Sequence, residues 1–388
     1  MQKVLLTNAQ LRKTLAAVRS LGKKGIQTIV VEETRFSPTA FSKYCTKSLV
    51  CQNASENPEH FYNFIKTKIK EYGCDVFFPM DEDTVAVAME HKEELEKLCS
   101  VPLPSYESYD ITSDKGKAYK HALAVGVDIP KTAFPSGADN LHEITAHLKY
   151  PLMVKPVKSN GGRGITTVSS REDLLKTYLE VHEHYPYPVI QEHLGEGDVY
   201  DVVLLYNSYN ELRASFVQRH VRKYPLVTGP STVQVSVVYP EMLELALKYM
   251  EGLNWYGIAD LEFMVQSETG EIKFIELNCK FWNSLQMGIY AGVDFPWLLY
   301  KIAVDGDVEP VGEYKAGIMC RNLLPGDILH FVFNKDRISM NPPFWSGKGY
   351  GIKDDIISKD DPMPVLGFFA ACMRYVFDKK MWKFLLRR

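Results

Sequence analysis

The sequence lacks the features of a secreted, membrane-spanning or zinc-dependent protein. Its seven cysteines are scattered singly over 388 residues, without a C-x-x-C pair or a His/Cys cluster at zinc spacing, so reduced thiols and a cytoplasmic location are expected. No apolar run approaches the length that spans a bilayer, and the first residues lack the apolar core and cleavage site of a signal peptide. The net charge of −3 argues against a general nucleic-acid binder.

Three common phosphate-binding signatures are also missing. The Walker A pattern does not occur, no G-x-G-x-x-G follows the first predicted strand, and the H-R-D and D-F-G motifs of kinases are absent. The composition, with 46% apolar and 24% charged residues, is that of an ordinary globular protein of two or three domains.

The first 105 residues have the pattern of a small Rossmann-like α/β unit. Apolar strands are predicted at 3–7, 27–31 and 75–79, with a helix at 10–21 and another that ends near residue 98. The order strand, helix, strand predicts parallel pairing with crossover helices.

The most informative stretch is a hairpin predicted from Gly257 to Phe281. Because residues two apart on a strand share a face, Asp260 and Glu262 point one way, and a turn near residue 269 places Glu262 opposite Glu276. Facing carboxylates repel each other, and a divalent cation would compensate. With the amide oxygen of Asn278 they form a set of hard oxygen ligands suited to Mg²⁺ and nucleotide phosphates. From the hairpin alone, an idle solvated acidic face is an equal alternative.

Two cations and a glycine-rich loop precede this hairpin. Lys115 is predicted in the first turn of a helix capped by Ser113 or Asp114, where the helix dipole disfavours a cation unless a phosphate lies nearby. Lys155 ends a strand that leads into Asn-Gly-Gly-Arg-Gly at 160–164. Glycines let backbone N–H groups cradle phosphate oxygens. The alternatives are an exposed lysine without a role and a structural turn.

Two further segments are ambiguous. An apolar strand that turns polar near Glu192 offers a backbone edge and a carboxylate for an adenine amino group and ribose hydroxyls, or a plain strand end. The cations and turn residues of 219–232 suit a mobile loop over an anionic ligand as well as an ordinary basic loop.

Taken in order, these features resemble the ATP-grasp superfamily of carboxylate–amine ligases over roughly residues 1–305. The stretch 281–296 is most similar to ATP-grasp proteins found among exopolysaccharide-biosynthesis genes. The resemblance implies an α/β fold with an α+β lid. It places a pre-ATP-grasp domain at 1–105, an ATP-grasp domain at 106–310 with its lid at about 130–195, and an extension at 311–388.

The resemblance also implies ATP and Mg²⁺, and a role for each motif. Lys115 and Lys155 would contact the phosphates. The other implied nucleotide-binding residues are Gly161, Gly162, Gly164, Gln191, Glu192, His193, Leu194 and Asp198. Glu262, Glu276 and Asn278 would coordinate Mg²⁺. The implied reaction phosphorylates a small-molecule carboxylate, and an amine or similar nucleophile then attacks the acylphosphate. Homodimers are common in the family, which leaves a homodimer open.

One position departs from the family pattern. Lys280 stands where the family usually has arginine, and lysine is a point charge rather than a two-point fork. Lys280 and Arg219 are the predicted catalytic residues, with Arg219 or Arg321 as candidates to replace the fork. The departure keeps two alternatives open, an ATP-grasp kinase or carboxylating enzyme and a degenerate ATP-binding sensor or scaffold.

The C-terminal stretch 374–388 carries six cations, one anion and many large apolar residues. It fits an amphipathic helix on an anionic membrane surface, or a terminal helix docked on the protein with a solvated basic face. The docked helix is favoured.

Overall fold

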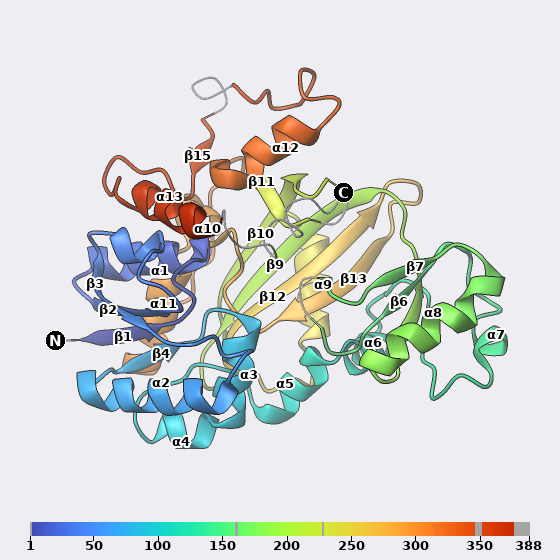
Figure 1. Cartoon of the computed structure of the whole chain (residues 1–388), viewed down its shortest axis with the longest axis horizontal. Coiled ribbons are helices and arrows are strands. Elements are labelled where there is room, and N and C mark those ends of the chain that lie inside the picture. Colours follow the sequence, from blue (N-terminus) through green and yellow to red (C-terminus); the bar gives the residue numbers. More distant parts are fainter. Residues whose placement is uncertain (1, 160–161, 227–228, 346–350, 376–388) are drawn as a thin grey trace.

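The computed structural model describes residues 2–159, 162–226, 229–345 and 351–375, and three sheets organise it (Figure 1). A parallel sheet belongs to the N-terminal unit, a small antiparallel sheet to the segment predicted as the lid, and a seven-stranded sheet lies between them.

The N-terminal unit contains a four-stranded parallel sheet of order β3-β2-β1-β4, as its strand–helix–strand pattern predicts. Its strands are β1 (Lys3–Leu6), β2 (Gln27–Glu32), β3 (Cys45–Val50) and β4 (Val76–Phe78). Its helices are α1 (Arg12–Lys23), η1 (Thr39–Phe41), α2 (Pro58–Tyr72), α3 (Glu82–Glu90) and α4 (Lys92–Glu96). Helix α2 shows why these boundaries occur, because Asn57 caps its start, Pro58 fits the first turn, and Gly73 ends it at a φ of 61°.

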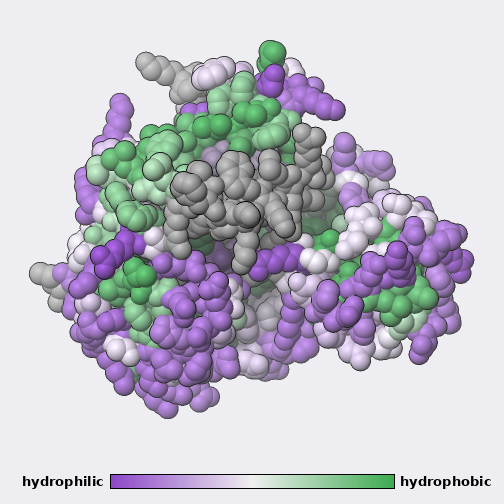
Figure 2. Space-filling view, viewed as in Figure 1, coloured by the Kyte–Doolittle hydropathy of each residue, from purple (hydrophilic) through white to green (hydrophobic). Residues whose placement is uncertain are grey.

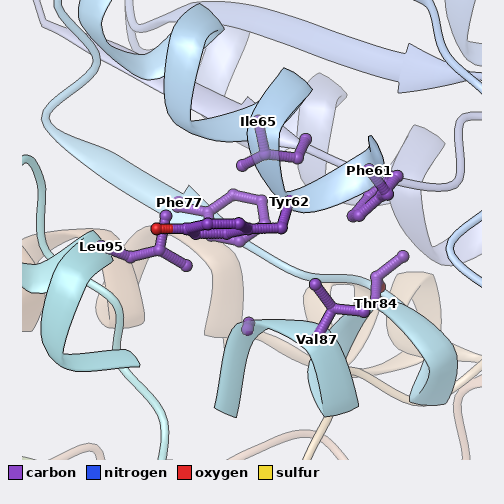
Figure 3. A pocket seen from close by; sticks show the side chains of 8 residues that line it. Phe61, Tyr62, Ile65, Phe77, Thr84, Val87 and Leu95 are labelled. Carbon is purple, nitrogen blue, oxygen red and sulfur yellow. The ribbon is translucent and has the colours of Figure 1, made fainter. Parts of the chain in front are cut away.

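Aromatic and aliphatic side chains fill the space between α2, α3, α4 and β4. Figure 3 shows Phe61, Tyr62 and Ile65 of α2 facing Phe77 of β4 and Val87 of α3. The gap between these side chains is too small to hold a water molecule. This region is therefore a packed core and not a ligand site.

The segment predicted as the lid contains a four-stranded antiparallel sheet of order β5-β8-β6-β7, which we call the lid sheet. Its strands are β5 (Thr132–Ala133), β6 (Leu152–Lys155), β7 (Thr166–Val168) and β8 (Val189–Glu192). Helices α7 (Leu141–Ile144) and α8 (Arg171–His184) accompany them. Ser170 caps α8 by accepting a hydrogen bond from the backbone N–H of Asp173, as in the capping pattern Ser-x-x-Asp.

The central sheet has the order β13-β12-β9-β10-β11-β14-β15. Its strands are β9 (Gly197–Tyr206), β10 (Leu212–Lys223), β11 (Ser231–Ser236), β12 (Gly257–Gln266), β13 (Ile272–Asn278), β14 (Met319–Arg321) and β15 (Lys353–Asp354). The remaining helical elements are α5 (Tyr106–Ser113), α6 (Lys115–Ala124), α9 (Pro240–Tyr249), α10 (Leu285–Ala291), α11 (Phe295–Asp305), η2 (Leu323–Asp327), α12 (Ile328–Phe333) and α13 (Pro364–Tyr375).

Alternate residues of β9 show how the two faces of this sheet are covered. Val202 and Leu204 pack in the core formed with α6 and α9. Val203 and Leu205 point the other way, into the core shared with α1, α10 and α11. Asp201 is on the side of Val203, since side chains alternate along a strand, so it faces the N-terminal unit.

Candidate functional site

A row of polar side chains crosses four strands on the face of the central sheet that carries Asp201. The β12–β13 pairing sets Glu262 opposite Glu276, which confirms the predicted register. The β9 pairings set Asp201 opposite Glu262 on one side and Gln218 on the other. We call the three acidic residues, Glu276, Glu262 and Asp201, the carboxylate row. Asp260 and Asn278 face each other two residues along the same hairpin.

Crowding of these carboxyl groups changes their acidity. Burial, together with repulsion from Glu276 and Asp201, raises the pKa of Glu262 to about 8. Burial also raises the pKa of Asp260 well above its ordinary range, again with help from Asp201 and Glu262. Asp260 is 6% exposed, and its Oδ1 has no hydrogen-bond partner among the described residues.

This donor set fits Mg²⁺ held jointly with phosphates rather than a metal held by protein alone. Glu262 and Glu276 offer facing carboxylates and Asn278 an amide oxygen, which are hard oxygen ligands. Within the described ranges, no three His, Cys, Asp or Glu side chains form a metal-binding group. Mg²⁺ commonly uses one or two carboxylates and takes its other ligands from water and nucleotide phosphates.

Two lysines approach the row from different elements. Asp114 caps α6, and Lys115 follows it, with its Nζ 2.9 Å from the Ser159 carbonyl oxygen and 3.8 Å from Glu276 Oε2. Lys155, at the end of β6, is buried and donates a hydrogen bond to Gln191 Oε1. Burial, together with repulsion from the neighbouring Lys115, lowers the pKa of Lys155 to about 8. The structure therefore brings both predicted phosphate ligands toward the predicted metal ligands.

Lys280 is held by groups from two parts of the chain. Its Nζ donates to Asn278 Oδ1 at 2.9 Å and pairs with Glu82 Oε1 at 2.7 Å. Burial lowers the pKa of Lys280, but the carboxylates of Glu82, Asp81 and Glu276 together outweigh burial, so the pKa is raised. Beside Glu82, Asp81 pairs with the buried Lys13 of α1 at 3.0 Å. The N-terminal unit thus contributes three charged groups that the sequence reasoning missed.

The position of Asp81 and Glu82 offered a signal for finding them. They follow β4, and in parallel sheets the carboxyl ends of the strands are where ligand-binding residues gather.

His220 is a further residue that the sequence reasoning missed. Its Nε2 lies 2.8 Å from Asp201 Oδ2. Burial lowers the pKa of His220, but the carboxylates of Asp201 and Glu262 together outweigh burial, so the pKa is raised. Gln218 also donates to Asp201, so Gln218 and His220 point to the same side. This two-residue spacing was a readable strand signal.

The segment 191–194, which is predicted to bind the nucleotide base, already makes several hydrogen bonds within the protein. Strand β8 is internal to the lid sheet, and the backbone N–H groups of Glu192 and His193 donate to the carbonyl oxygens of Lys131 and Pro151. The Glu192 carboxylate accepts from the Lys149 N–H at 2.7 Å. Two of the backbone N–H groups in this segment, those of Glu192 and His193, are therefore already hydrogen-bonded within the protein.

The neighbouring base-segment residues also have partners. Gln191 is buried between Lys155 and Thr132. The Leu194 carbonyl accepts from Gln266 Nε2 at 3.1 Å.

Strands β6 and β7 flank the glycine-rich loop, as predicted. Gly161 lies outside the described residues. Gly164 has a φ of +74°, and a Cβ there would come within 2.7 Å of the Tyr185 ring and 2.8 Å of Pro156. Gly162 has a φ of +72° but open space around it. Glycine is thus required at 164 for both conformation and space.

The structure does not bring Arg219 to the carboxylate row. Arg219 pairs across the sheet with Tyr200, so it points to the opposite face from Asp201, and its Nη1 lies 3.2 Å from Asp198. Asp198 is likewise on that face. Arg321, the other candidate fork, donates to the Phe344 carbonyl at 3.3 Å.

The predicted loop at 219–232 is also corrected. Residues 219–223 belong to β10 and 231–232 to β11, and residues 227–228 lie outside the described part. Buried charge pairs explain the misleading composition, because Arg222 pairs with Asp327 at 3.0 Å inside the protein.

A cavity of about 270 Å³ lies where α1, β11 and the C-terminal extension meet. Leu11 and Arg12 line it at the start of α1, with Thr232 from β11 and Asn283 from just beyond Lys280. The extension supplies a largely apolar wall of Leu324, Pro325, Leu329, Ile356 and Phe368.

Few polar groups in this cavity are free to bind a ligand. Thr232 is 3% exposed, and its Oγ1 has no hydrogen-bond partner within the described ranges. Arg12 is already engaged by Asp355 at 2.7 Å and the Ser231 carbonyl at 2.8 Å. The first turn of α1 contains no acidic residue, and Leu11 provides no side-chain cap. The helix end therefore still favours an acceptor or a single negative charge.

This chain is similar in sequence and in fold to several known enzymes. A family model described as the C-terminus of D-ala D-ala ligase matches residues 128–281, less than half of the chain. The biotin carboxylase of Campylobacter jejuni in complex with β,γ-ATP superposes with a TM-score of 0.71 at 18% identity, over 82% of this chain and 74% of that one. N5-carboxyaminoimidazole synthetase of Staphylococcus aureus gives 0.63 at 14% identity, over 81% and 80%.

Among curated sequences, the formate-dependent phosphoribosylglycinamide formyltransferase of Prochlorococcus marinus is 22% identical over 71% of this chain and 68% of its own length. The acetyl-CoA carboxylase of Schizosaccharomyces pombe is 23% identical, but this chain spans only 8% of its length. The predicted fold class is confirmed, since the neighbours have the ATP-grasp fold, and proteins with this fold bind ATP or ADP with Mg²⁺. The comparisons do not show the predicted similarity to exopolysaccharide-cluster proteins. No helix in the described ranges is long and apolar enough to cross a membrane.

Proposed function

We propose that this ATP-grasp chain is an ATP- and Mg²⁺-dependent, ADP-forming ligase that joins a small-molecule carboxylate to an amine or similar nucleophile. The observation that carries the proposal is the carboxylate row of Glu276, Glu262 and Asp201, which Lys115 approaches beside Glu276. Phosphoryl transfer needs mainly positioning and stabilisation of charge, and this arrangement provides both.

Each group has a part in the proposal. Glu262, Glu276 and Asn278 would hold Mg²⁺, which would bridge phosphate oxygens and neutralise the charge that develops on them. Lys115 and Lys155 would hold the phosphates, and Gln191 would keep Lys155 in place through its hydrogen bond. The implied base-binding residues and Gly161 remain part of this proposal, without further support from the described contacts.

Lys280 would take the place of the family's arginine. Its Nζ is fixed by Asn278 and Glu82, so it is a positioned charge although it cannot form a two-point fork. His220 on the same face would add a proton-bearing group beside Asp201. Arg219 has no role in this scheme, because it points to the other face.

The cavity beside Asn283 is the proposed pocket for the body of the substrate. Its size is at the small end of ligand sites, and its largely apolar wall with a few polar groups is typical of such sites. The Thr232 hydroxyl and the start of α1 would bind one polar or singly charged group. A small substrate with an apolar part fits better than a highly charged one, since the Arg12 guanidinium is already paired.

Hydroxylamine trapping tests the reaction. The protein is mixed with Mg-ATP, hydroxylamine and pooled amino acids and sugar acids, and ADP, AMP and hydroxamate are followed, with Glu276→Ala as the control. ADP with hydroxamate, both lost in the control, is the expected result, because an acylphosphate reacts with hydroxylamine. Formation of AMP would contradict the proposal.

Carboxylation is the second candidate, favoured by the similarity to biotin carboxylase and N5-carboxyaminoimidazole synthetase. In that case bicarbonate would be the carboxylate that is phosphorylated. ADP formation that depends on bicarbonate, and not on the pooled acids, would favour it. A place in surface-polysaccharide synthesis rests on the residue resemblance at 281–296 alone, and turnover with a sugar acid would support it.

A further inference from the structure

The C-terminal extension, of which residues 346–350 and 376–388 lie outside the described part of the chain, supplies one wall of the cavity at the start of α1. Leu329 of α12, Phe368 of α13 and Ile356 belong to this wall. Figure 2 shows hydrophobic residues gathered over the region where Figure 1 places α12 and α13. The described residues of the extension that line the cavity include no charged side chain.

Buried charge and close packing hold this wall against the N-terminal unit. Arg19 of α1 pairs with Asp361 at 2.9 Å, and their side chains are 6% and 1% exposed. Arg19 also donates to the Ile356 carbonyl oxygen at 2.9 Å. Helix α13 approaches the unit so closely that a Cβ at Gly367 would lie 2.6 Å from the Ser37 carbonyl oxygen. The wall is therefore fixed in position.

The lining of the cavity is electrically neutral. Arg12 is the only charged side chain among the described residues that line it, and Asp355 pairs with Arg12 at 2.7 Å. Among the remaining polar groups, Thr232 Oγ1 is buried and has no hydrogen-bond partner within the described ranges. A buried hydroxyl without a partner is unfavourable, so a ligand group that bonds to it is favoured. A body with several charges would instead lose its hydration without gaining counterions.

The size of the cavity and its apolar wall limit the body of a ligand. At about 30 Å³ for each water molecule, the volume of about 270 Å³ is room for about nine water-sized groups. A phenyl ring or a branched alkyl chain fits this space and would bury its surface against Leu329, Ile356 and Phe368. A sugar acid carries a hydroxyl on almost every carbon, and the hydroxyls that face this wall would lose water without gaining partners. The wall therefore selects against polyhydroxylated bodies.

The cavity lies beside Lys280. Asn283, which lines the cavity, is only three residues beyond Lys280 in the chain. On the side of α1, Arg12 lines the cavity, and the adjacent Lys13 is close enough to Lys280 for the two charges to interact. A ligand whose body occupies the cavity can therefore direct a carboxylate toward Lys280.

We propose that the C-terminal extension determines which carboxylate this chain accepts. The accepted class is monocarboxylic acids with a compact aromatic or branched apolar body that carries at most one further hydrogen-bonding group. The body lies against Leu329 and Phe368, its hydrogen-bonding group meets Thr232, and its carboxylate points toward Lys280. The role of that carboxylate rests on the proposed function, whereas occupancy of the cavity requires no turnover.

Methyl NMR spectra of the isoleucine-labelled full chain test this proposal without nucleotide. Ile356 lines the cavity and is the reporter, and Ile338, which is 93% exposed and not part of the lining, is the control signal. The probes are 3-phenylpropanoate, 3-(4-hydroxyphenyl)propanoate and gluconate. The variants are Thr232→Val and Phe368→Ala, and the matched control is Phe369→Ala, at a neighbouring ring that is 51% exposed.

Both phenylpropanoates should shift the Ile356 signal and leave Ile338 unchanged, whereas gluconate at the same concentration should shift neither. The 4-hydroxyl group should tighten binding to the wild type about threefold or more, and Thr232→Val should abolish this gain. Phe368→Ala should weaken both phenylpropanoates about tenfold, and Phe369→Ala should not. Since valine is nearly isosteric with threonine, the Thr232→Val result does not depend on how α13 tolerates substitution.

Two results would overturn the proposal: no shift of Ile356 with any probe, or a shift with gluconate as large as with the phenylpropanoates. Hydroxylamine trapping with the same acids and Mg-ATP separates this proposal from the proposed function. Hydroxamate from the phenylpropanoates and none from gluconate would support both. Hydroxamate from gluconate alone would overturn the selectivity and keep the ligase. Occupancy of the cavity without hydroxamate from any acid would support the selectivity and contradict the ligase.

Discussion

Replacing Glu262 by glutamine should stabilise the ligand-free protein at alkaline pH. The folded state raises the pKa of Glu262 from 4.5 to about 8, through burial and then repulsion from Glu276 and Asp201. Between these two values the folded chain binds a proton that the unfolded chain has released. The free energy of unfolding therefore falls as pH rises through this interval. The contribution of Glu262 is fully present below about pH 4.5 and is lost by about pH 8.

The size of the effect follows from the pKa shift. At 1.36 kcal/mol for each unit, the whole shift corresponds to at most about 4–5 kcal/mol. Glu262 is partly exposed on the sheet face, so solvent screens the repulsion, and about 2 kcal/mol is a reasonable expectation. Glutamine has nearly the same shape but no charge, so Glu262→Gln should match the wild type near pH 5 and exceed it by about 2 kcal/mol at pH 8.5.

Urea unfolding of the ligand-free protein at pH 5 and pH 8.5 measures this difference. Glu268→Gln in the exposed turn of the same hairpin is the matched control and should show no pH-dependent gain. If Glu262→Gln lowers stability at pH 8.5, or changes it equally at both pH values, the reasoning about facing carboxylates is wrong.

Three further predictions concern the lysines, the loop and the charge pairs. Lys155→Met should weaken ATP binding about tenfold or more in a calorimetric titration, because it removes a charged hydrogen-bond donor. Gln191→Leu, which removes only the partner of this lysine, should weaken binding less. Unchanged affinity in Lys155→Met would contradict the role of this lysine. Gly164→Ala should lower the free energy of unfolding, measured in urea, by about 1–2 kcal/mol. Gly162→Ala, which has open space for its Cβ, should lower it less. A larger loss in Gly162→Ala would contradict the role of Tyr185 and Pro156 in excluding a side chain at position 164. Arg222→Met should lower the free energy of unfolding by about 3–5 kcal/mol, because it leaves the buried Asp327 carboxylate unpaired. Arg219→Met, at a partly exposed ion pair, should change it by no more than about 0.5 kcal/mol. Similar losses in the two variants would contradict the assignment of Arg222 to the buried face of β10 and of Arg219 to the other face.

Local periodicity explains what could be predicted from the sequence. The two-residue alternation of the β12–β13 hairpin predicts that Glu262 faces Glu276, and the structure confirms it. The caps at Asp114 and Ser170 could be predicted because each side chain bonds to a backbone N–H three residues later. The predicted parallel N-terminal sheet and the ATP-grasp fold are likewise confirmed.

Contacts between distant segments explain what could not be predicted. Lys280 depends on Glu82, and no local pattern links a residue after β13 with one that follows β4. The cations and turn residues of 219–232 predict a loop by composition, but Arg222 is buried in β10 against Asp327 from the extension. The cavity joins three regions that are far apart in sequence, so its shape emerges only after folding.

Calorimetric titration with a non-hydrolysable ATP analogue, with and without Mg²⁺, tests the central claim most directly. If Glu262 and Glu276 hold the metal, Mg²⁺ should tighten binding to the wild type and to a Glu271→Gln control, and Glu276→Gln should lose this gain while still binding the nucleotide. Equal affinities with and without Mg²⁺ in the wild type, or a full Mg²⁺ effect in Glu276→Gln, would contradict the assignment of the carboxylate row as the Mg-nucleotide site.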